Sequence, residues 1–159
     1  MDMRFRDSGN KECSVEEVVK EIHDFMGAKK EASYNIMVGT DSQLLSDKTA
    51  DFVTAIVVHR VGHGGRYFWR KIPKGKFYTL RDRILEEVLL SIDIAKEVLV
   101  FLGKHKEIDF GFEIHVDVGE KGETRAIIQE VVGMVTAHNF EARTKPLSYA
   151  ASKVADLYC

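Results

Sequence analysis

The chain has 159 residues, and its 23 basic and 25 acidic side chains give a formal net charge of −2. This length suits one domain with one ordinary core, and the near-neutral charge argues against a strongly basic nucleic-acid-binding domain. No apolar stretch approaches the roughly 18 to 20 residues that cross a bilayer, and the N-terminus lacks the apolar core of a signal peptide, so we expect a cytoplasmic protein with no membrane partner. Cys13 and Cys159 form no Cys/His cluster, which argues against structural zinc and a disulfide framework.

The first half of the chain predicts one helix followed by three strands. The expected elements are a helix over 14–27 and strands over 34–40, 52–59 and 67–72. Ser14 and Glu17 have the spacing of a capping box at the start of the helix. The glycine-rich segment 62–65 separates the second and third strands and indicates a hairpin.

The second half alternates helices and strands. The expected elements are a helix over 79–102, a strand over 110–118, a helix over 124–137, a strand over 140–144 and a final helix from Ser148. Strands that are joined through helices lie parallel, so the sequence predicts a mixed sheet with helices on its faces. On the strand 110–118, His115 shares a face with Glu113; this favours a structural role, with a proton carrier beside Asp117 as the less favoured alternative.

Two aspartates fall at the ends of strands. Asp41 follows the apolar run 34–40, and Asp117 lies near the end of the strand 110–118. If these strands are parallel neighbours, both carboxylates emerge at the edge where open α/β sheets bind ligands. A carboxylate pair repels itself unless a cation lies between, which favours a hard metal such as Mg²⁺. Taken singly, each aspartate is as readily a turn residue.

Further acids lie on the predicted helices. Glu87 shares a helix face with Leu80 and Ile84 and can therefore point inward, while Glu86 lies about 100° around the helix and is the rival candidate. Asp156 lies on the last helix. Taken alone, each of these acids is more readily an exposed surface residue.

The order of elements and acids resembles the ribonuclease H fold. More narrowly, several motifs resemble the YkuK family of ribonuclease H-like proteins: Val38 to Gln43, His115 to Gly119, Thr124-Arg125, Lys145-Pro146, Leu80-Arg81 ahead of Glu87, and the closing Ala150-Ala151-Ser152 with Ala155-Asp156. The resemblance covers about residues 34–159. It implies a three-layer α/β fold with a mixed five-stranded sheet and helices on both faces, preceded by an N-terminal helical extension over 1–33. It also implies an acidic metal site, in which Asp41, Asp117, Glu87 and Asp156 match the four acids.

A basic stretch interleaved with aromatic residues runs from Arg66 to Arg83. Basic side chains neutralise phosphates and aromatic faces stack on bases, although a solvated hairpin face explains the same pattern about as well. The candidate nucleic-acid contacts are Arg70, Lys71, Lys74, Lys76, Arg81 and Lys145.

Two functions remain open from the sequence. The first is a metal-dependent nuclease that uses Mg²⁺ or Mn²⁺, held by the four acids, to hydrolyse phosphodiester bonds of RNA, DNA or a hybrid. The second is a non-catalytic module of the same fold that binds nucleic acid or a protein. The sequence does not indicate an oligomeric state.

Overall fold

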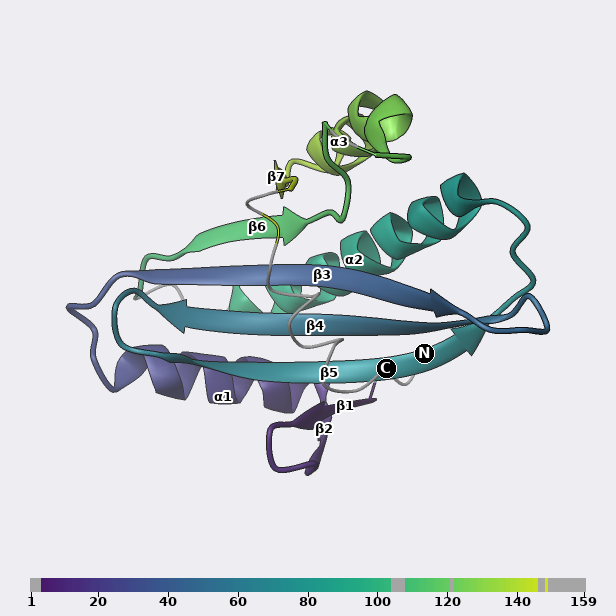
Figure 1. The fold of residues 1–159 in the computed structure, drawn as a ribbon. Helices are drawn as coiled ribbons and strands as arrows, with labels where there is room; N and C mark the ends of the chain where they lie inside the picture. Colours follow the sequence, from purple (N-terminus) through teal and green to yellow (C-terminus); the bar gives the residue numbers. More distant parts are fainter. Residues whose placement is uncertain (1–3, 104–107, 121, 146–147, 149–159) are drawn as a thin grey trace.

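The computed structural model describes residues 4–103, 108–120, 122–145 and 148. Its elements, in chain order, are β1 (Arg4–Asp7), β2 (Glu12–Ser14), α1 (Val15–Gly27), β3 (Tyr34–Leu44), β4 (Ala50–Arg60), β5 (Gly65–Lys74), α2 (Leu80–Leu102), β6 (Gly111–His115), a 3₁₀ turn (Arg125–Ile127), α3 (Ile128–Ala137) and β7 (Glu141–Arg143). Figure 1 shows the sheet with α1 and α2 behind it.

The strands form one mixed sheet in the order β2-β1-β5-β4-β3-β6-β7. The hairpin strands β3, β4 and β5 pair antiparallel, whereas β6 pairs parallel to both β3 and β7. The predicted mixed α/β fold is therefore confirmed. Its strand count differs from the prediction: the described chain has seven strands instead of five, because β1 and β2 extend the sheet beyond β5.

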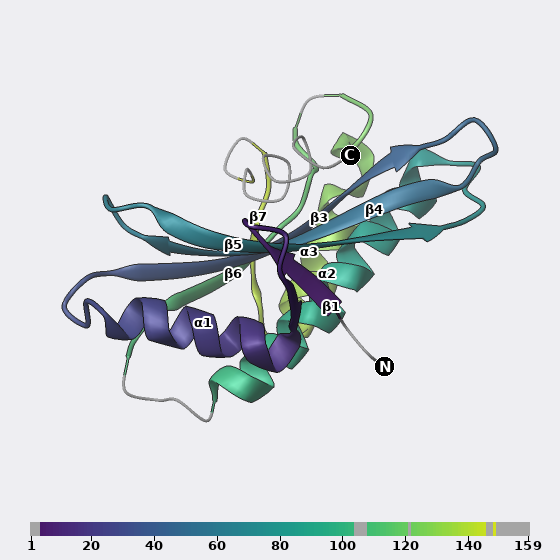
Figure 2. The same cartoon turned by 90° about the horizontal axis from the view of Figure 1, so that it is seen from below.

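One apolar core joins the described helices to the sheet. Side chains of α1, α2 and α3, among them Ile22, Val98 and Val135, pack in one cluster with Ile36 and Val38 of β3. Figure 2 shows α1 and α2 on the same side of the sheet. The final helix predicted from Ser148 lies, apart from that residue, outside the described residues. No helix within the described ranges has the length and apolar character needed to cross a membrane.

The start of α1 agrees with its sequence signal. The Ser14 hydroxyl accepts a hydrogen bond from the Glu17 amide at 3.1 Å, and the Glu17 carboxylate accepts one from the Ser14 amide at 3.1 Å. This reciprocal pair satisfies two amides that the first helical turn leaves without partners. The capping box therefore fixes where β2 ends and α1 begins.

Several predicted elements have different bounds in the structure. The strand expected over 34–40 continues to Leu44, so Asp41 lies within β3 and not after it. The strand expected over 110–118 ends at His115, so Asp117 lies in the loop after β6 and not within the strand. The helix expected over 124–137 begins as the 3₁₀ turn 125–127 before α3. Within the loop between these two elements, the Gly119 amide donates a hydrogen bond to the Thr124 hydroxyl at 3.1 Å.

Truncating Ile22 to alanine is expected to lower the free energy of unfolding by about 2–5 kcal/mol, because it removes buried methyl groups and leaves a cavity. Ile22 is fully buried in α1, within the core shared with β3. Urea denaturation measures the change. The control is Lys20→Ala, an exposed position on the same helix, with an expected effect within about 0.5 kcal/mol. Equal effects of the two variants would mean that α1 is not part of the core.

Candidate functional site

Three buried hydroxyl groups seat α2 against the sheet. The Thr40 hydroxyl on β3 lies 2.9 Å from that of Thr54 on β4 and 2.8 Å from that of Ser91 on α2. One helical turn from Ser91 lies Glu87, and two residues on from Thr40 lies Ser42 on the same face of β3. The packing of α2 on the sheet therefore brings Glu87 next to the end of β3.

Glu87 is held there by a short chain of hydrogen bonds. The Ser42 hydroxyl donates to the Glu87 carboxylate at 2.5 Å, and the guanidinium of Arg83 lies 3.1 Å from that hydroxyl and 3.2 Å from the Ser42 carbonyl. Glu87 is only 5 % exposed. Glu86, the rival from the sequence, is turned to a different partner and pairs with Lys74 at 2.5 Å. Ser42 and Arg83 were not among the predicted site residues, although Arg83 lies one helical turn before Glu87.

The pKa of Glu87 is raised well above its ordinary value. Burial is the largest cause, and the negative charges of Asp41 and Asp117 add to it. The hydrogen bond from Ser42 and the charge of Arg83 act in the opposite direction. Glu87 therefore interacts electrostatically with both aspartates. The three predicted acids lie close enough for the charges of Asp41 and Asp117 to oppose ionisation of Glu87.

The two aspartates lie near the C-terminal ends of two neighbouring parallel strands. Asp41 is part of β3, where its carboxylate accepts a hydrogen bond from the Ser42 amide at 2.9 Å. Asp117 lies two residues beyond β6, and its partly exposed carboxylate pairs with Lys145 at 3.1 Å. The Lys145 amide in turn donates to the Val118 carbonyl at 2.8 Å, which ties the segment after β7 to the Asp117 loop. The fourth predicted acid, Asp156, lies outside the described residues.

A second polar network lies beside these acids on β6 and β7. The His115 ring lies 2.9 Å from the Glu113 carboxylate, whose other oxygen pairs with Arg143 at 3.1 Å. Glu113 and His115 are both buried. This arrangement agrees with the structural role that the shared strand face favoured for His115.

The predicted nucleic-acid contacts differ in their surroundings. Lys74 pairs with Glu86, Lys145 with Asp117, and Arg81 with Glu130 at 2.5 Å. The other three predicted contacts are Arg70, Lys71 and Lys76, of which Lys71 lies 3.8 Å from Asp51. Lys71, Lys74 and Arg81 of the basic stretch therefore lie next to acids, which makes the stretch less positive than its sequence indicates.

The donor chemistry of the three acids fits a hard divalent cation. All three offer carboxylate oxygens, the ligand type that Mg²⁺ and Mn²⁺ prefer, and the mutual repulsion at Glu87 is what a cation would relieve. Their oxygens do not form a closed cluster. Among the described residues, the group whose ligand atoms all lie within 4.8 Å of one another is Asp7, Cys13 and Glu21, at the other end of the sheet. There, Asp7 already accepts two backbone hydrogen bonds of the β1–β2 turn, from Gly9 and Lys11.

Comparison with known proteins agrees with this fold. The family model described as "Ribonuclease H-like" matches residues 17–159. A Bacillus subtilis (strain 168) protein described as "Uncharacterized protein YkuK" is 31 % identical over 160 residues, which span 92 % of this chain and 91 % of the relative. No solved structure matches the chain significantly. The chain therefore belongs to the ribonuclease H-like family and, within it, to the YkuK proteins.

Proposed function

We propose that this chain is a metal-dependent nuclease that hydrolyses phosphodiester bonds of RNA or DNA. The observation that carries the proposal is the buried Glu87, whose pKa is raised beside Asp41 and Asp117. A folded protein gains no stability from three acids that repel one another in a partly buried region, which makes a bound cation the simplest reason for the arrangement.

Asp41, Glu87 and Asp117 would hold one or two Mg²⁺ or Mn²⁺ ions, with Asp156 as the fourth acid that the family resemblance implies. Such ions activate an attacking water and stabilise the leaving oxygen of a phosphodiester. The chain's own residues then have defined tasks. Ser42 and Arg83 fix the orientation of the Glu87 carboxylate through the hydrogen bonds described above.

Lys145 has two tasks in this proposal. Without a cation, it neutralises Asp117 at 3.1 Å. If Asp117 held a cation, the half-exposed Lys145 ammonium group would be available to a phosphate of the nucleic acid. The remaining backbone contacts would come from Lys74, Lys76 and Arg81. The pairs of Lys74 and Arg81 with Glu86 and Glu130 are partly exposed, and pairs of this kind are weak enough to exchange partners.

The test is a cleavage assay with the full chain on three substrate types: an RNA–DNA hybrid, a branched DNA and a single strand. We expect cleavage of at least one of them in the presence of Mg²⁺ or Mn²⁺, and none after chelation with EDTA. Cleavage that persists unchanged in EDTA would contradict the proposal.

A non-catalytic module that binds nucleic acid or a protein is the second candidate. The observation in its favour is that the acids are satisfied without a metal, since Asp117 pairs with Lys145 and Glu87 accepts from Ser42. The two candidates differ in a thermal melt. A nuclease of the proposed kind is expected to gain about 2.7 kcal/mol of stability at a metal concentration 100 times the Kd, because the ion binds only the folded state. An unchanged Tm across a Mg²⁺ and Mn²⁺ titration would favour the non-catalytic module.

A further inference from the structure

Exposed apolar side chains gather at the end of the sheet beyond the acids. This end, the tip, is formed by residues 44–49 of the β3–β4 connection and residues 75–79 of the β5–α2 connection, which Figure 1 shows at the right-hand end of the sheet. Leu44 is 42 % exposed, Leu45 39 % and Tyr78 76 %. Exposed apolar side chains that are surrounded by polar residues mark binding surfaces when they occur together.

The two segments of the tip are held to each other. The Phe77 amide donates a hydrogen bond to the Lys48 carbonyl at 2.8 Å, and the Phe77 ring packs against Phe52 with their centres 5.3 Å apart. Tyr78 follows directly, and the side chain of Thr79 then caps the start of α2. Tyr78 therefore extends into water from a loop that is fixed on both sides.

The tip continues from the acids along both β3 and α2. Leu44 lies two residues beyond Ser42 on the same face of β3, a distance of about 7 Å, and Ser42 is the residue that donates to Glu87. On α2, Arg83 reaches Ser42 from one turn before Glu87, and Tyr78 precedes Arg83 just ahead of the helix. A strand of nucleic acid that binds at the acids can therefore reach the tip.

Positive charge accompanies the apolar side chains of the tip. Lys48 and Lys76 are exposed and form no ion pair with any described residue. The acid of the tip, Asp47, accepts hydrogen bonds from the amide and the hydroxyl of Thr49. These hydrogen bonds lower the pKa of Asp47, and the charge of Lys76 adds to the effect. Two lysines and one aspartate leave an excess of positive charge, which favours a phosphate.

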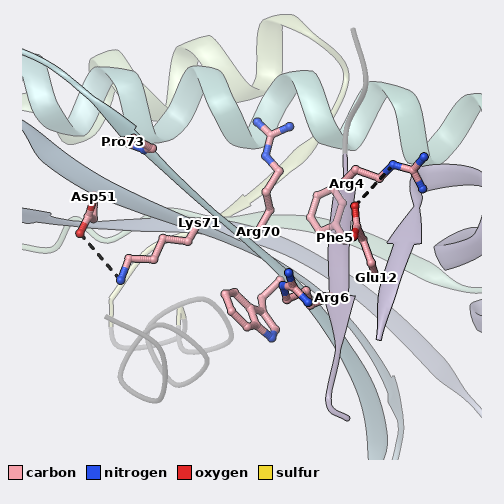
Figure 3. Close-up of a pocket in the computed structure, with 9 residues that line it drawn as sticks. Arg4, Phe5, Arg6, Glu12, Asp51, Arg70, Lys71 and Pro73 are labelled. Carbon is pink, nitrogen blue, oxygen red and sulfur yellow. Dashed lines mark ion pairs between the residues drawn. The ribbon is translucent and has the colours of Figure 1, made fainter. Parts of the chain in front are cut away.

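The cations further along β5 do not extend this surface. Arg70 and Lys71 are consecutive residues of the strand and leave it on opposite faces of the sheet, as Figure 3 shows. Lys71 lies 3.8 Å from Asp51. One strand of nucleic acid cannot contact both side chains. A strand bound at the acids is therefore expected to continue toward the tip and not along β5.

We propose that Tyr78 is a stacking platform for an unpaired base, so that the substrate of the proposed nuclease is single-stranded nucleic acid; this inference rests on the proposed function. The Tyr78 ring is 76 % exposed and packs against no other aromatic ring among the described residues, so its face is open to a base. Bases of a single strand can turn out and stack on an aromatic side chain. Bases within a duplex would first have to leave their pairs, which costs free energy.

The test is the binding of a fluorescein-labelled oligothymidylate of about 12 nucleotides to the full chain in EDTA, followed by fluorescence anisotropy. The same strand is also offered as a duplex with oligodeoxyadenylate, and an abasic strand of equal length serves as the probe without bases. We expect the single strand to bind at least about fivefold more tightly than the duplex and the abasic strand, because one stacked base contributes at least this factor.

Variants decide the role of Tyr78. Tyr78→Ala is expected to weaken binding of the single strand at least about fivefold and to leave binding of the abasic strand unchanged. Tyr78→Phe keeps the ring and should bind as the wild type does. The control is Val100→Ala, which truncates another exposed apolar side chain on α2 and should leave binding unchanged. Equal or tighter binding of the duplex, or full binding of the single strand by folded Tyr78→Ala, would overturn the proposal.

Cleavage in Mn²⁺ separates this inference from the proposed function. Tyr78→Ala is expected to raise KM for the single strand by about the factor lost in binding, with kcat little changed, because stacking holds the substrate in the ground state and the transition state alike. Binding that depends on Tyr78 without any cleavage would contradict the nuclease and keep the platform. Cleavage of the single strand at the same KM by Tyr78→Ala would contradict the platform and keep the nuclease.

Discussion

Replacing Asp41 with asparagine is expected to lower metal-dependent cleavage by more than about a hundredfold. Loss of an outer partner of a metal ligand already costs about 10–100-fold, and loss of a ligand itself should cost more. Asparagine keeps the oxygen that accepts the Ser42 amide at 2.9 Å, so the end of β3 should keep its conformation. The variant therefore removes charge from the site with little change in shape. Initial rates of cleavage under single-turnover conditions measure the effect.

The matched control is Asp93→Asn, the same chemical change at an exposed position of α2. It should cleave at the wild-type rate. Circular dichroism melts of both variants check that they are folded. If folded Asp41→Asn cleaves as fast as the wild type, then either the activity belongs to a contaminant or Asp41 is not a metal ligand. Either result would contradict the proposed metal site.

The chain order of the central strands could be predicted because each is a long apolar run. The segments 34–40 and 52–59 are recognisable as strands without knowledge of the strands they pair with. The helix predicted over 79–102 connects the hairpin to the next strand, and a helical connection of this kind predicts the parallel pairing of β3 and β6 that the structure shows. β1 and β2 were missed for the opposite reason. They are four and three residues long, and only Phe5 and Cys13 in them are buried, so their stability comes from pairing with β5 and packing on α1.

In the candidate site, too, the features that could not be predicted depend on contacts between residues far apart in the sequence. Periodicity alone could not decide between Glu86 and Glu87, because both flank the apolar stripe of α2; the hydrogen bond from Ser42, 45 residues away, distinguishes them. The strength of the basic stretch was overestimated since the acid opposite Arg81 is Glu130, 49 residues further on.

Replacing Glu87 with glutamine is expected to stabilise the metal-free protein at neutral pH. An unfolded glutamate loses its proton near pH 4.5, whereas burial and the charges of Asp41 and Asp117 raise the pKa of folded Glu87 well above that value. Between the two pKa values the folded state holds one more proton than the unfolded state, so stability falls as the pH rises through this window. Glutamine stays neutral and keeps an oxygen for the Ser42 hydroxyl, and it should remove this loss.

The measurement is Tm as a function of pH in EDTA for the wild type, Glu87→Gln and the exposed control Glu97→Gln. Below pH 4.5 the Glu87 variant and the wild type should melt together, and above it the variant should melt progressively higher. Each 1 kcal/mol gained raises Tm by about 2 to 4 °C in a chain of this size. Addition of Mn²⁺ should reverse the order, because only the wild type offers all three carboxylates to the ion. Two results would contradict this prediction. If Glu87→Gln melts below the wild type at neutral pH in EDTA, the Glu87 charge stabilises the protein and Glu87 is an ordinary paired carboxylate. If the variant gains as much Tm from Mn²⁺ as the wild type, Glu87 does not contribute to metal binding.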